Sequence, residues 1–424
     1  MQSLLRPEWS RKMRFFSFVS MVLLVFVHGY DLNDRYLQPF TFVAEKMTVT
    51  TFFEYLTANG LFRFRIPMLF AISGYLLALG DSKGYWKIIG KRFRTLAVPL
   101  ILWSAIGALI AYGLYHWSFT HQSVQNIHMQ PTEKNWNEFG PAEWARTIGS
   151  TNVSYQLWFI RSLFILNLVY PALRWLTLKA TTPWFVYIAL MWTFMPVGMI
   201  EFAVLIAGEG SPLAQALRHL HGPWEIVLDG EGLLPFCLGI WLCKRGKDLS
   251  QKPRWFSMPV FAGIFVGAAV AKTILSYYGN FQNPFPIGVP IWLLHKVVVA
   301  SGMLVAWFGA DRLAAWGLRQ RWFRHASDQS FMIYALHVPL ITYLIDPVHG
   351  LLQGFRYYRL ATYALLPTAI ILAAILVGSL LKQLAPPVFG ILTGNRGLKP
   401  LPVPPPAAED GQVRVLSPVT PVNR

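Results

Sequence analysis

Residues 15–28 read FFSFVSMVLLVFVH, an apolar run that ends on a histidine. Only Ser17 and Ser20 interrupt the run before His28. Such a stretch is typical of a helix that crosses a lipid bilayer, and it places an imidazole where the helix leaves the membrane. Basic residues precede the run as they do in a signal peptide. The following GYDLNDRYL lacks a small-residue cleavage site, so a retained first helix is predicted.

The composition of the chain gives its structural class. Of its 424 residues, 54% are hydrophobic and only 13% are charged, whereas soluble domains carry about 25% charged residues. Repeated long apolar runs favour helices over the short alternating segments of a transmembrane barrel. The sequence therefore predicts an all-α polytopic membrane protein whose partners include membrane lipids.

About ten transmembrane helices are expected from apolar stretches near the ~20 residues that a bilayer-crossing helix needs. They are 13–30, 61–80, 95–115, 156–178, 184–206, 226–243, 255–277, 289–309, 329–345 and 360–382. With both termini cytoplasmic, the inner segments hold 25 Lys and Arg residues and the outer segments hold seven. The positive-inside rule explains this asymmetry. The net charge of +17 therefore reflects topology and does not indicate a nucleic-acid partner.

The chain divides into a cytoplasmic N-terminus (1–12), a transmembrane domain (13–385) and a proline-rich tail (386–424). The tail cannot bury a core and is predicted to be disordered. The largest outer segments are 31–60 and 116–155. The second is rich in Trp and His, so it either presents aromatic edges to a sugar or forms an interfacial aromatic belt. Its histidines lack metal-ligand spacing, and no metal site is predicted.

Charged and polar residues within the spans need an explanation because each costs free energy in lipid. Arg63 and Arg65 open the second span at the same outer level as His28. A guanidinium there could bind an anion or stabilise an oxyanion. Alternatively, both arginines could extend to the outer lipid headgroups. This second explanation is favoured for Arg65, because residues two apart on a helix point to different faces.

Other polar residues within the spans have two explanations as well. Arg161 lies near the outer end of its span, and His337 lies mid-span, where it could simply bond a neighbouring helix. Asp31 could orient His28, or could begin the loop. Further candidates that nothing in the sequence connects are Lys272, His295, Lys296 and Glu201.

A basic strip opens the third span on the inner side. Lys91, Arg92 and Arg94 lie where this span leaves the cytoplasm. Positive-inside anchoring accounts for them, and docking of a phosphorylated cofactor is the alternative.

Five stretches, taken in order, resemble the membrane acyltransferase-3 family. They are VLLVFVH (22–28), RFRIPMLFAISGYLL (63–77), KRFRTLAVPLILW (91–103), LWFIRSL (157–163) and SFMIYALHVPL (330–340). In the family, the corresponding segments are a first helix that ends in a histidine, an arginine–proline–FxxSGFLL segment, a basic RxxRxxxP motif at the start of the third helix, LWFLxxL and SxxIYLLHxP. The resemblance covers most of 13–345. It implies a protein of about ten spanning helices that O-acylates sugars or related acceptors.

The resemblance also implies roles for individual residues. His28 falls on the catalytic histidine, and Arg63 on an arginine that the family often places four residues before a proline. Lys91 and Arg94 fall on a basic pair thought to bind acyl-CoA. Three further residues fall on family motif positions whose chemical role is less defined: Trp158, Phe159 and His337.

The chain departs from the family pattern at two positions. Many members carry an arginine eleven residues before the histidine, where this chain has Ser17, and Arg14 lies three residues earlier. Lys91 also replaces the first arginine of the basic pair. The first departure puts any role for Arg14 in doubt.

Together these features predict an acyl-CoA-dependent O-acyltransferase, a multi-pass protein of the bacterial cytoplasmic (inner) membrane. It would transfer an acyl group, with acetyl-CoA the first donor expected, to a hydroxyl of an outward-facing glycan or glycolipid. His28 would be the general base or, as a second possibility, a transient acyl acceptor. The alternative function is a polysaccharide exporter or small-solute transporter whose path His28, Arg63 and His337 line.

The remaining candidate residues take supporting roles in this prediction. Arg63 would stabilise developing negative charge, and Arg161 could assist it. The acceptor would bind Arg161, Trp158 and His337. The CoA phosphates would bind Lys91, Arg92 and Arg94.

Overall fold

The computed structural model describes residues 7–30, 42–179, 211–212, 232–249, 251–280 and 285–398, and every element in these ranges is a helix. The predicted all-α class is confirmed for this part of the chain. Its α-helices are α1 (Pro7–His28), α2 (Val49–Tyr55), α3 (Arg65–Leu79), α4 (Tyr85–Arg92), α5 (Val98–His116), α6 (His121–Asn126), α7 (Pro141–Ser150), α8 (Trp158–Leu168), α9 (Tyr170–Lys179), α14 (Leu233–Lys244), α15 (Met258–Ser276), α16 (Phe285–Gly309), α17 (Asp311–Arg319), α18 (Arg321–Asp328), α19 (Ser330–Leu352), α20 (Tyr358–Leu384) and α21 (Pro386–Thr393).

Short irregular helices connect several of these elements. Two are π-helices, η1 (Leu56–Leu61) between α2 and α3, and η3 (Phe93–Ala97) between α4 and α5. The 3₁₀-helices are η2 (Asp81–Lys83), η4 (Trp136–Glu138) and η5 (Asn152–Leu157). π-helical segments are rare and often occur at functional sites, so residues near η1 and η3 are candidates for a functional role.

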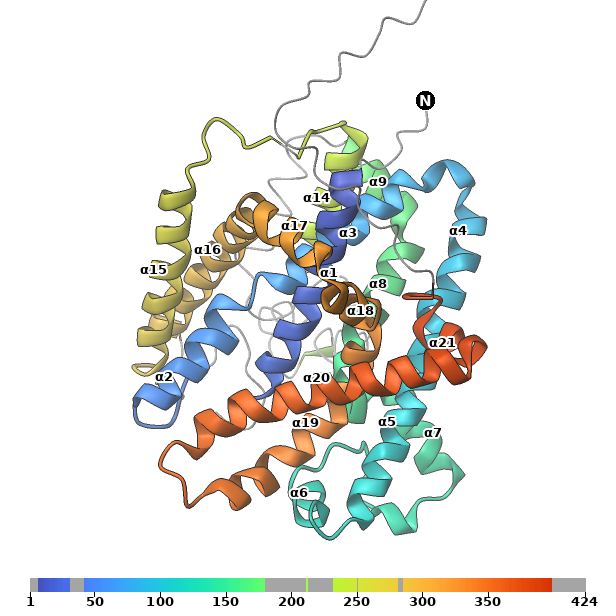
Figure 1. Cartoon of the computed structure of the whole chain (residues 1–424), viewed down its shortest axis with the longest axis vertical. Coiled ribbons are helices and arrows are strands. Elements are labelled where there is room, and N and C mark those ends of the chain that lie inside the picture. The colour runs from blue at the N-terminus through green and yellow to red at the C-terminus, as the bar shows by residue number, and fades with distance from the viewer. Residues whose placement is uncertain are drawn as a thin grey trace, which may run out of the picture.

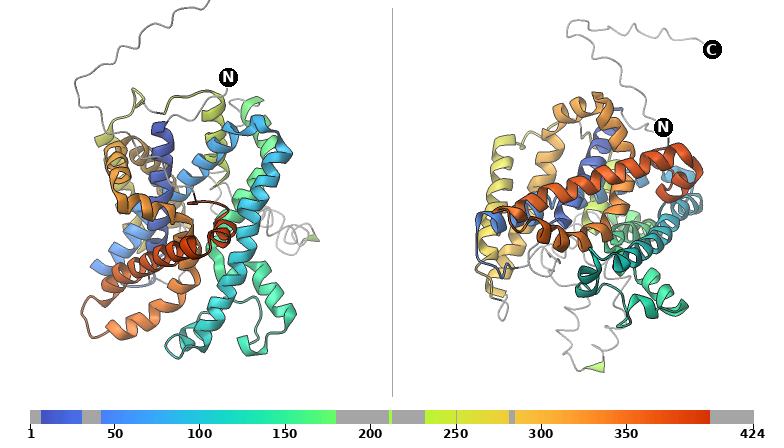
Figure 2. Two further views of the ribbon diagram at one scale, coloured as in Figure 1. Left: turned by 45° about the vertical axis from the view of Figure 1, so that its right-hand side comes forward. Right: turned by 60° about the horizontal axis from the view of Figure 1, so that its bottom comes forward.

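Helix α1 lies in the middle of the bundle and packs against α3, α17, α19 and α20. Figure 1 shows the α15–α16 pair on one side of α1 and the helices α4, α5 and α7 on the other. Helix α20 runs obliquely across the bundle beside α19, an arrangement that both views of Figure 2 also show. The end of α1 is therefore surrounded by helices that are far from it in sequence.

Six described helical stretches are long and apolar enough to cross a membrane, or seven if the segments 141–168 and 170–178, bent by 68°, form one span. The six are 49–79, 85–116, 258–276, 286–309, 330–352 and 358–384. The predicted span 184–206 lies outside the described residues, and α14 supplies only part of the predicted span 226–243. Ten spans with cytoplasmic termini therefore remain a prediction.

Two segments predicted as loops contain helices. The segment 31–60, predicted to lie outside and described from residue 42, contains α2 and most of η1. Helix α2 begins at Val49 because the Thr48 hydroxyl accepts a hydrogen bond from the Thr51 amide at 3.2 Å. The segment 81–94, predicted to lie inside, contains α4, which continues through η3 into α5. A prediction based on the length of apolar runs does not detect these two helices, because α2 and α4 carry polar residues and lie at the ends of the apolar stretches.

Glycines let α3 and α14 pack with their backbones in close contact. A Cβ at Gly74 would lie 2.1 Å from the Phe236 carbonyl oxygen, and one at Gly239 would lie 2.0 Å from the Ala71 carbonyl oxygen. Small residues are the usual means of close helix association in membranes. This contact fixes α3, and with it the arginines at its N-terminal end.

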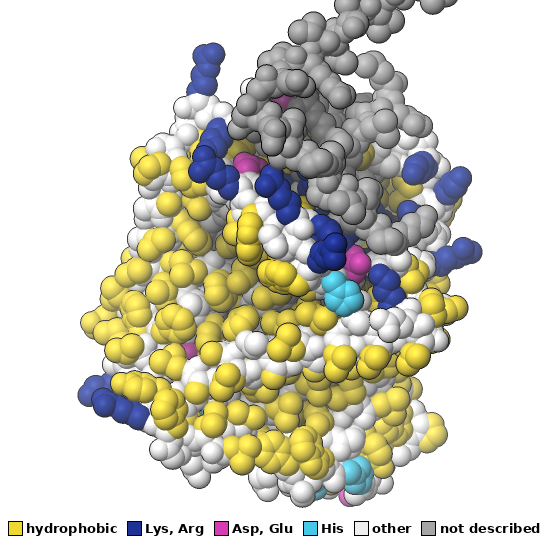
Figure 3. Space-filling model, in the orientation of Figure 1, with side chains coloured by type: hydrophobic (Ala, Val, Ile, Leu, Met, Phe, Trp, Pro, Cys, Tyr) yellow, Lys and Arg dark blue, Asp and Glu magenta, His cyan; other side chains and the backbone are white. Residues whose placement is uncertain are grey.

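The surface of the molecule has the polarity of a membrane protein. Figure 3 shows Lys and Arg side chains gathered along the upper part of one face, toward the end where α1 begins, above a broad apolar belt. In α20, Leu365, Leu372 and Leu376 are each about 60% exposed and share one face of the helix. An exposed stripe of this kind suits contact with lipid.

The segment 116–155, predicted to lie outside, buries some of its aromatic residues and exposes others. Trp136 is 2% exposed and stacks on Phe139 with ring centroids 4.8 Å apart, while Trp117 is 51% exposed. His121 Nδ1 donates to the Tyr115 carbonyl, and His128 Nε2 bonds the Thr132 carbonyl at 2.7 Å. Both histidines thus stabilise local turns.

Candidate active site

His28 is the last residue of α1 and is half-buried. The next residue is a glycine because a Cβ at position 29 would lie 2.6 Å from Pro367 Cγ of α20. Helix α1 therefore ends against α20, and this contact fixes the position of the imidazole.

Tyr155 of η5 contacts the His28 ring directly. Its hydroxyl lies 3.1 Å from His28 Nδ1 and 3.4 Å from Thr342 Oγ1 of α19. The two rings meet edge to face with centroids 5.1 Å apart. Three separate segments, α1, η5 and α19, therefore join in one polar contact at the end of α1.

His337 of α19 lies beside His28, with ring centroids 5.3 Å apart. Its Nδ1 donates to the Tyr334 carbonyl at 2.8 Å and contacts the Ile333 carbonyl at 3.2 Å. A carbonyl only accepts, so Nδ1 carries the proton, and in the neutral ring Nε2 has the lone pair. His337 is fully buried, and Nε2 has no hydrogen-bond partner within the described part of the chain. The site therefore contains an unused acceptor.

A break in α19 follows His337. Val338 has non-helical dihedrals (φ −110°, ψ 134°), and Pro339 has no backbone N–H to donate. The Gln156 amide compensates by donating to the carbonyls of Ala335 at 3.0 Å and Val338 at 3.2 Å. Carbonyls left without a donor at membrane depth are costly, so Gln156 stabilises the break that positions His337.

Arg63 and Arg65 both act electrostatically on His28, and Arg65 also acts on His337. Arg65 is 3% exposed, and its Nη1 donates to the Phe62 carbonyl at 2.7 Å. Sequence spacing favoured a headgroup position for Arg65, because residues two apart diverge on a regular helix. Here the π-helix η1 and the turn at 62–64 precede α3, so the regular spacing does not apply.

Helix η1 is stabilised by two of the polar residues that the sequence left unconnected. Lys272 is fully buried, and its Nζ donates to the Asn59 carbonyl of η1 at 2.6 Å. The same Nζ lies 3.3 Å from Nδ1 of the buried His295. We infer that Lys272 and His295 support η1 and so the approach to Arg63. Glu201 and Asp31 lie outside the described residues.

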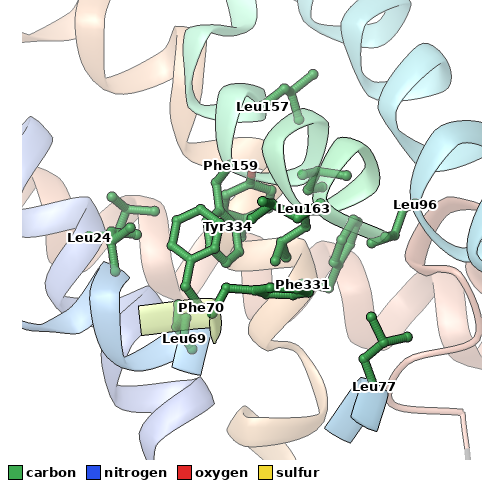
Figure 4. Packing of buried hydrophobic residues seen from close by; sticks show 14 of the residues in the cluster. Leu24, Leu69, Phe70, Leu77, Leu96, Leu157, Phe159, Leu163, Phe331 and Tyr334 are labelled. Atoms are coloured by element: carbon green, nitrogen blue, oxygen red, sulfur yellow. The ribbon is translucent and has the colours of Figure 1, made fainter. Parts of the chain in front are cut away.

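The predicted acceptor-binding residues Trp158 and Arg161 lie on α8. Trp158 packs against the apolar cluster shown in Figure 4, with its ring 6.3 Å from that of Phe70. In this cluster Phe70 and Phe159 meet edge to face at 5.0 Å, and Tyr334 lies next to Phe159. Arg161 is half-buried three residues after Trp158. The structure thus gives Trp158 a packing role, and the acceptor role of both residues remains a prediction.

Lys91, Arg92 and Arg94, here named the inner basic face after their predicted side of the membrane, lie where α4 continues into η3. Lys91 and Arg94 are exposed, whereas Arg92 is half-buried. Arg14, in contrast, is bound within the fold: it pairs with Asp328, and its Nε donates to Ser327 Oγ at 3.0 Å. Arg14 therefore connects α1 to the α18–α19 junction.

Sequence reasoning named His28, Arg63 and His337; the structure places His337 beside His28, and the Arg63 charge acts on His28, while their roles remain predictions. Sequence reasoning missed Tyr155, Gln156 and Thr342, and it gave Arg65 the wrong environment. Tyr155 and Gln156 directly precede the LWFIRSL motif, and Thr342 follows the HVP motif by three residues. Proximity to these motifs was the available signal. Within the described residues, no group of three His, Cys, Asp or Glu side chains is placed to hold a metal ion.

Comparison with known proteins gives two matches. A family model described as "Acyltransferase domain" matches residues 14–382. The chain is also 28% identical over 354 residues to the succinoglycan biosynthesis protein ExoH of Rhizobium meliloti (strain 1021), which covers 82% of this chain and 84% of the relative. No solved structure matches the chain.

Proposed function

The chain belongs to the acyltransferase family whose domain matches residues 14–382, and we propose that it is a membrane O-acyltransferase that modifies a glycan. The acyl donor is a cytoplasmic acyl-CoA, with acetyl-CoA the first to test, and the acceptor is a hydroxyl of an outward-facing glycan or glycolipid. The relative is a succinoglycan biosynthesis protein, which supports a glycan acceptor. The protein acts in the bacterial cytoplasmic (inner) membrane.

The observation that carries the proposal is the contact between His28 and Tyr155, beside His337 and two arginines. In the reaction, His28 Nε2 removes the proton from the acceptor hydroxyl while the oxygen attacks the thioester carbonyl. The carbon–sulfur bond then breaks, and the CoA thiolate leaves and takes the proton from His28. An ester and free CoA result, and His28 returns to its neutral form.

The hydrogen bond of Tyr155 supports this use of Nε2. For Nε2 to accept a proton, Nδ1 must carry the hydrogen in the neutral ring. The Tyr155 hydroxyl, 3.1 Å from Nδ1, can accept from Nδ1–H and donate to Thr342 Oγ1, 3.4 Å away. Tyr155 is thus a positioning residue that fixes both the tautomer and the ring orientation.

Charge stabilisation and acceptor binding involve the neighbouring groups. Arg63 and Arg65 stabilise the oxyanion of the tetrahedral intermediate, because their positive charges act at His28. The unused Nε2 acceptor of His337 binds a second hydroxyl of the glycan, since a buried acceptor gains most from a donor that the substrate brings. Arg161 contributes to the acceptor side, and the inner basic face binds the donor.

The test is acyl-CoA-dependent labelling of glycans in membranes that contain matched amounts of wild type, His28→Ala or His116→Ala. General-base catalysis contributes roughly 100- to 10,000-fold, so His28→Ala should lose at least about 99% of the wild-type rate. His116 is an exposed histidine at the end of α5, and its replacement should leave labelling unchanged.

Several acyl-CoA donors should be supplied, beginning with labelled acetyl-CoA. If His28→Ala labels as fast as wild type, His28 is not the base, and His337 is the next candidate. If the protein moves a glycan or small solute across vesicles without consuming any acyl-CoA, the transporter alternative replaces the enzyme.

A further inference from the structure

The segment 386–398, here named the C-terminal hook, docks onto the inner half of the bundle. It consists of α21 followed by a turn, and it lies beyond the residues 14–382 that match the family. Trp103 Nε1 of α5 donates to the Leu392 carbonyl at 2.9 Å, and Lys382 Nζ donates to the Gly397 carbonyl at 2.5 Å. The predicted disordered tail therefore begins later than residue 386.

Two glycines let the turn of the hook approach η3 and α18. Gly394 and Gly397 both have positive φ (59° and 75°), a region that favours glycine. A Cβ at Gly394 would lie 2.5 Å from the Thr95 carbonyl oxygen, and one at Gly397 would lie 2.1 Å from the Asp328 carbonyl oxygen. The turn thus brings Arg396, the second of the two residues between them, against the bundle.

Within the hook, Arg396 contacts η3 and α19. Its Nη1 donates to the carbonyls of Thr95 and Thr393, both at 2.9 Å, and its guanidinium lies 4.8 Å from the centre of the Phe331 ring. Arg92 is close enough for its charge to act on Arg396. Burial, and to a lesser degree the neighbouring Arg92 charge, lower the pKa of Arg396 to about 10. It is therefore still cationic near neutral pH.

The guanidiniums of Arg396 and Arg92 have N–H donors that make no hydrogen bond with a described residue. The Nη1 bonds are the hydrogen bonds that Arg396 makes with the described residues, and a guanidinium has five N–H donors. Arg92 makes no hydrogen bond with a described residue and is half-buried. The Asp328 carboxylate, which lies close to the hook, is already bound by Arg14 and by Lys382. An incoming anion would relieve the repulsion between Arg92 and Arg396.

We propose that Arg396 and Arg92 form an anion site that binds phosphate groups of the acyl donor at the inner end of the bundle. The identity of the donor rests on the proposed function. Arginine suits this task because its planar fork donates two hydrogen bonds to a phosphate at once. The site makes the hook a part of the donor-binding machinery and adds a fourth cation to the inner basic face.

The position of the site fits a donor that must reach His28. Arg396 lies against Phe331, and Phe331 and His337 are six positions apart on α19, a rise of roughly 9 Å. Between them lies the Tyr334 ring, 5.8 Å from the Phe331 ring and 6.3 Å from the His337 ring. The aromatic rings of Phe331 and Tyr334 thus separate a donor with its phosphates at Arg396 from His337.

The test measures coenzyme A and inorganic pyrophosphate binding to the full-length protein in phosphatidylcholine nanodiscs. Arg396→Gln and Arg92→Gln should each weaken coenzyme A binding roughly 10- to 100-fold, because each removes charge-assisted hydrogen bonds. Arg396→Lys should retain part of the affinity. Arg254→Gln, which removes an exposed arginine before α15, should bind like wild type.

A purely structural role for Arg396 needs a separate control. Trp103→Phe removes the hydrogen bond to the hook and leaves its charges in place. It should bind coenzyme A within about threefold of wild type, because no donor to the phosphate is lost. If Trp103→Phe and Arg396→Lys both lose binding as fully as Arg396→Gln, then docking of the hook matters and the anion site is wrong.

The remaining outcomes separate this inference from the proposed function. Unchanged coenzyme A binding by Arg396→Gln overturns the site and leaves the acyltransferase untouched. Pyrophosphate binding that depends on Arg396 without any coenzyme A binding overturns the proposed donor but supports the anion site. If Arg396 instead determines thermal stability only in nanodiscs with added phosphatidylglycerol, the site binds a lipid headgroup and the donor assignment is wrong.

Discussion

The His28 site and the inner basic face both hold cations beside the apolar core, but their backbones differ. At the His28 site the side chains come from places where helices end or break: the end of α1, the turn and helix start that follow the π-helix η1, the 3₁₀-helix η5 and the break in α19. At the inner basic face, two cations end the regular helix α4 and the third follows it in η3. Interrupted helices bring distant side chains to one point, whereas a regular helix spreads them along a face.

Cations elsewhere in the bundle show how a structural charge is balanced. Asp81 pairs with Lys244 at 2.6 Å and with Arg174 at 3.3 Å, and Asp328 pairs with Arg14 and Lys382. We interpret cations in such carboxylate pairs as stabilising the fold. The charges of Arg63 and Arg65 act on His28, and that of Arg65 also acts on His337. Partner identity, more than charge itself, therefore separates structural cations from candidate functional ones.

The largest effect that sharpens this comparison is expected at Arg65. Arg65→Gln should lower the acylation rate roughly 100-fold or more, because loss of one oxyanion donor has that effect in other enzymes. Arg63→Gln should lower it less, because Arg63 is half-buried while Arg65 is 3% exposed and acts on both histidines. Initial rates of glycan labelling at saturating acyl-CoA measure both variants.

A folding defect must be separated from lost catalysis in this experiment. Arg65→Lys keeps the charge and the approximate size, so it should fold and recover part of the rate. Size-exclusion profiles and melting temperatures in detergent provide the check. A larger loss in Arg63→Gln than in Arg65→Gln would show that the regular-helix argument from sequence was correct after all.

A smaller effect is expected when the Tyr155 hydroxyl is removed. Tyr155→Phe should lower the rate about tenfold, because His28 then loses the group 3.1 Å from Nδ1 that selects its tautomer. Tyr343→Phe is the matched control, since Tyr343 is fully buried on α19 and its hydroxyl has no partner within the described residues. It should keep wild-type activity.

The pH profile distinguishes positioning from packing. Loss of a positioning hydrogen bond should shift the acidic limb of the rate profile as well as its height. A uniform drop at every pH, matched by Tyr343→Phe, would assign Tyr155 a packing role and remove the tautomer argument.

The sequence predicted the parts of this molecule that follow regular physical patterns. The predicted spans 255–277 and 360–382 match α15 and α20, because a long apolar run in lipid is stable only as a helix that satisfies its own backbone hydrogen bonds. His28 and His337 were identifiable because a polar residue inside an apolar run needs a reason. These inferences use only local sequence and helix geometry.

The partners of these residues could not be predicted in the same way. Tyr155 lies 127 residues from His28 and reaches it through η5, whose approach to α5 depends on Gly107 opposite Ser154. Arg65 is buried and its charge acts on His28 after a π-helix and a turn that a regular helical spacing does not describe. Arg396 lies in a segment whose prolines indicated disorder, and only its docking against Thr95 and Phe331 shows otherwise. Each case depends on tertiary packing that local patterns do not encode.

The smallest effect on activity is expected where a charge is fully balanced. Asp328→Asn removes the carboxylate shared by Arg14 and Lys382, whose side chains are 20% and 26% exposed. It should destabilise the fold by about 1–3 kcal/mol, because it leaves partly buried cations without their counter-charge. The acylation rate of the folded fraction should stay within about threefold of wild type, since Asp328 has no part in the chemistry.

The pair between Lys12 and Asp311, in which only the carboxylate is exposed, provides the contrast for Asp328. Their atoms lie 2.6 Å apart, and the Asp311 side chain is 59% exposed whereas that of Asp328 is 12% exposed. Water screens an exposed carboxylate, and the buried Lys12 keeps its contact with the Trp307 ring, 4.8 Å away, when Asp311 is replaced. Asp311→Asn should therefore lower the apparent melting temperature in detergent less than Asp328→Asn does. Equal shifts would mean that burial does not set the strength of these pairs. A rate loss in Asp328→Asn comparable to that of Arg65→Gln would place Arg14 or Lys382 in the functional machinery, and the division by partner identity would fail.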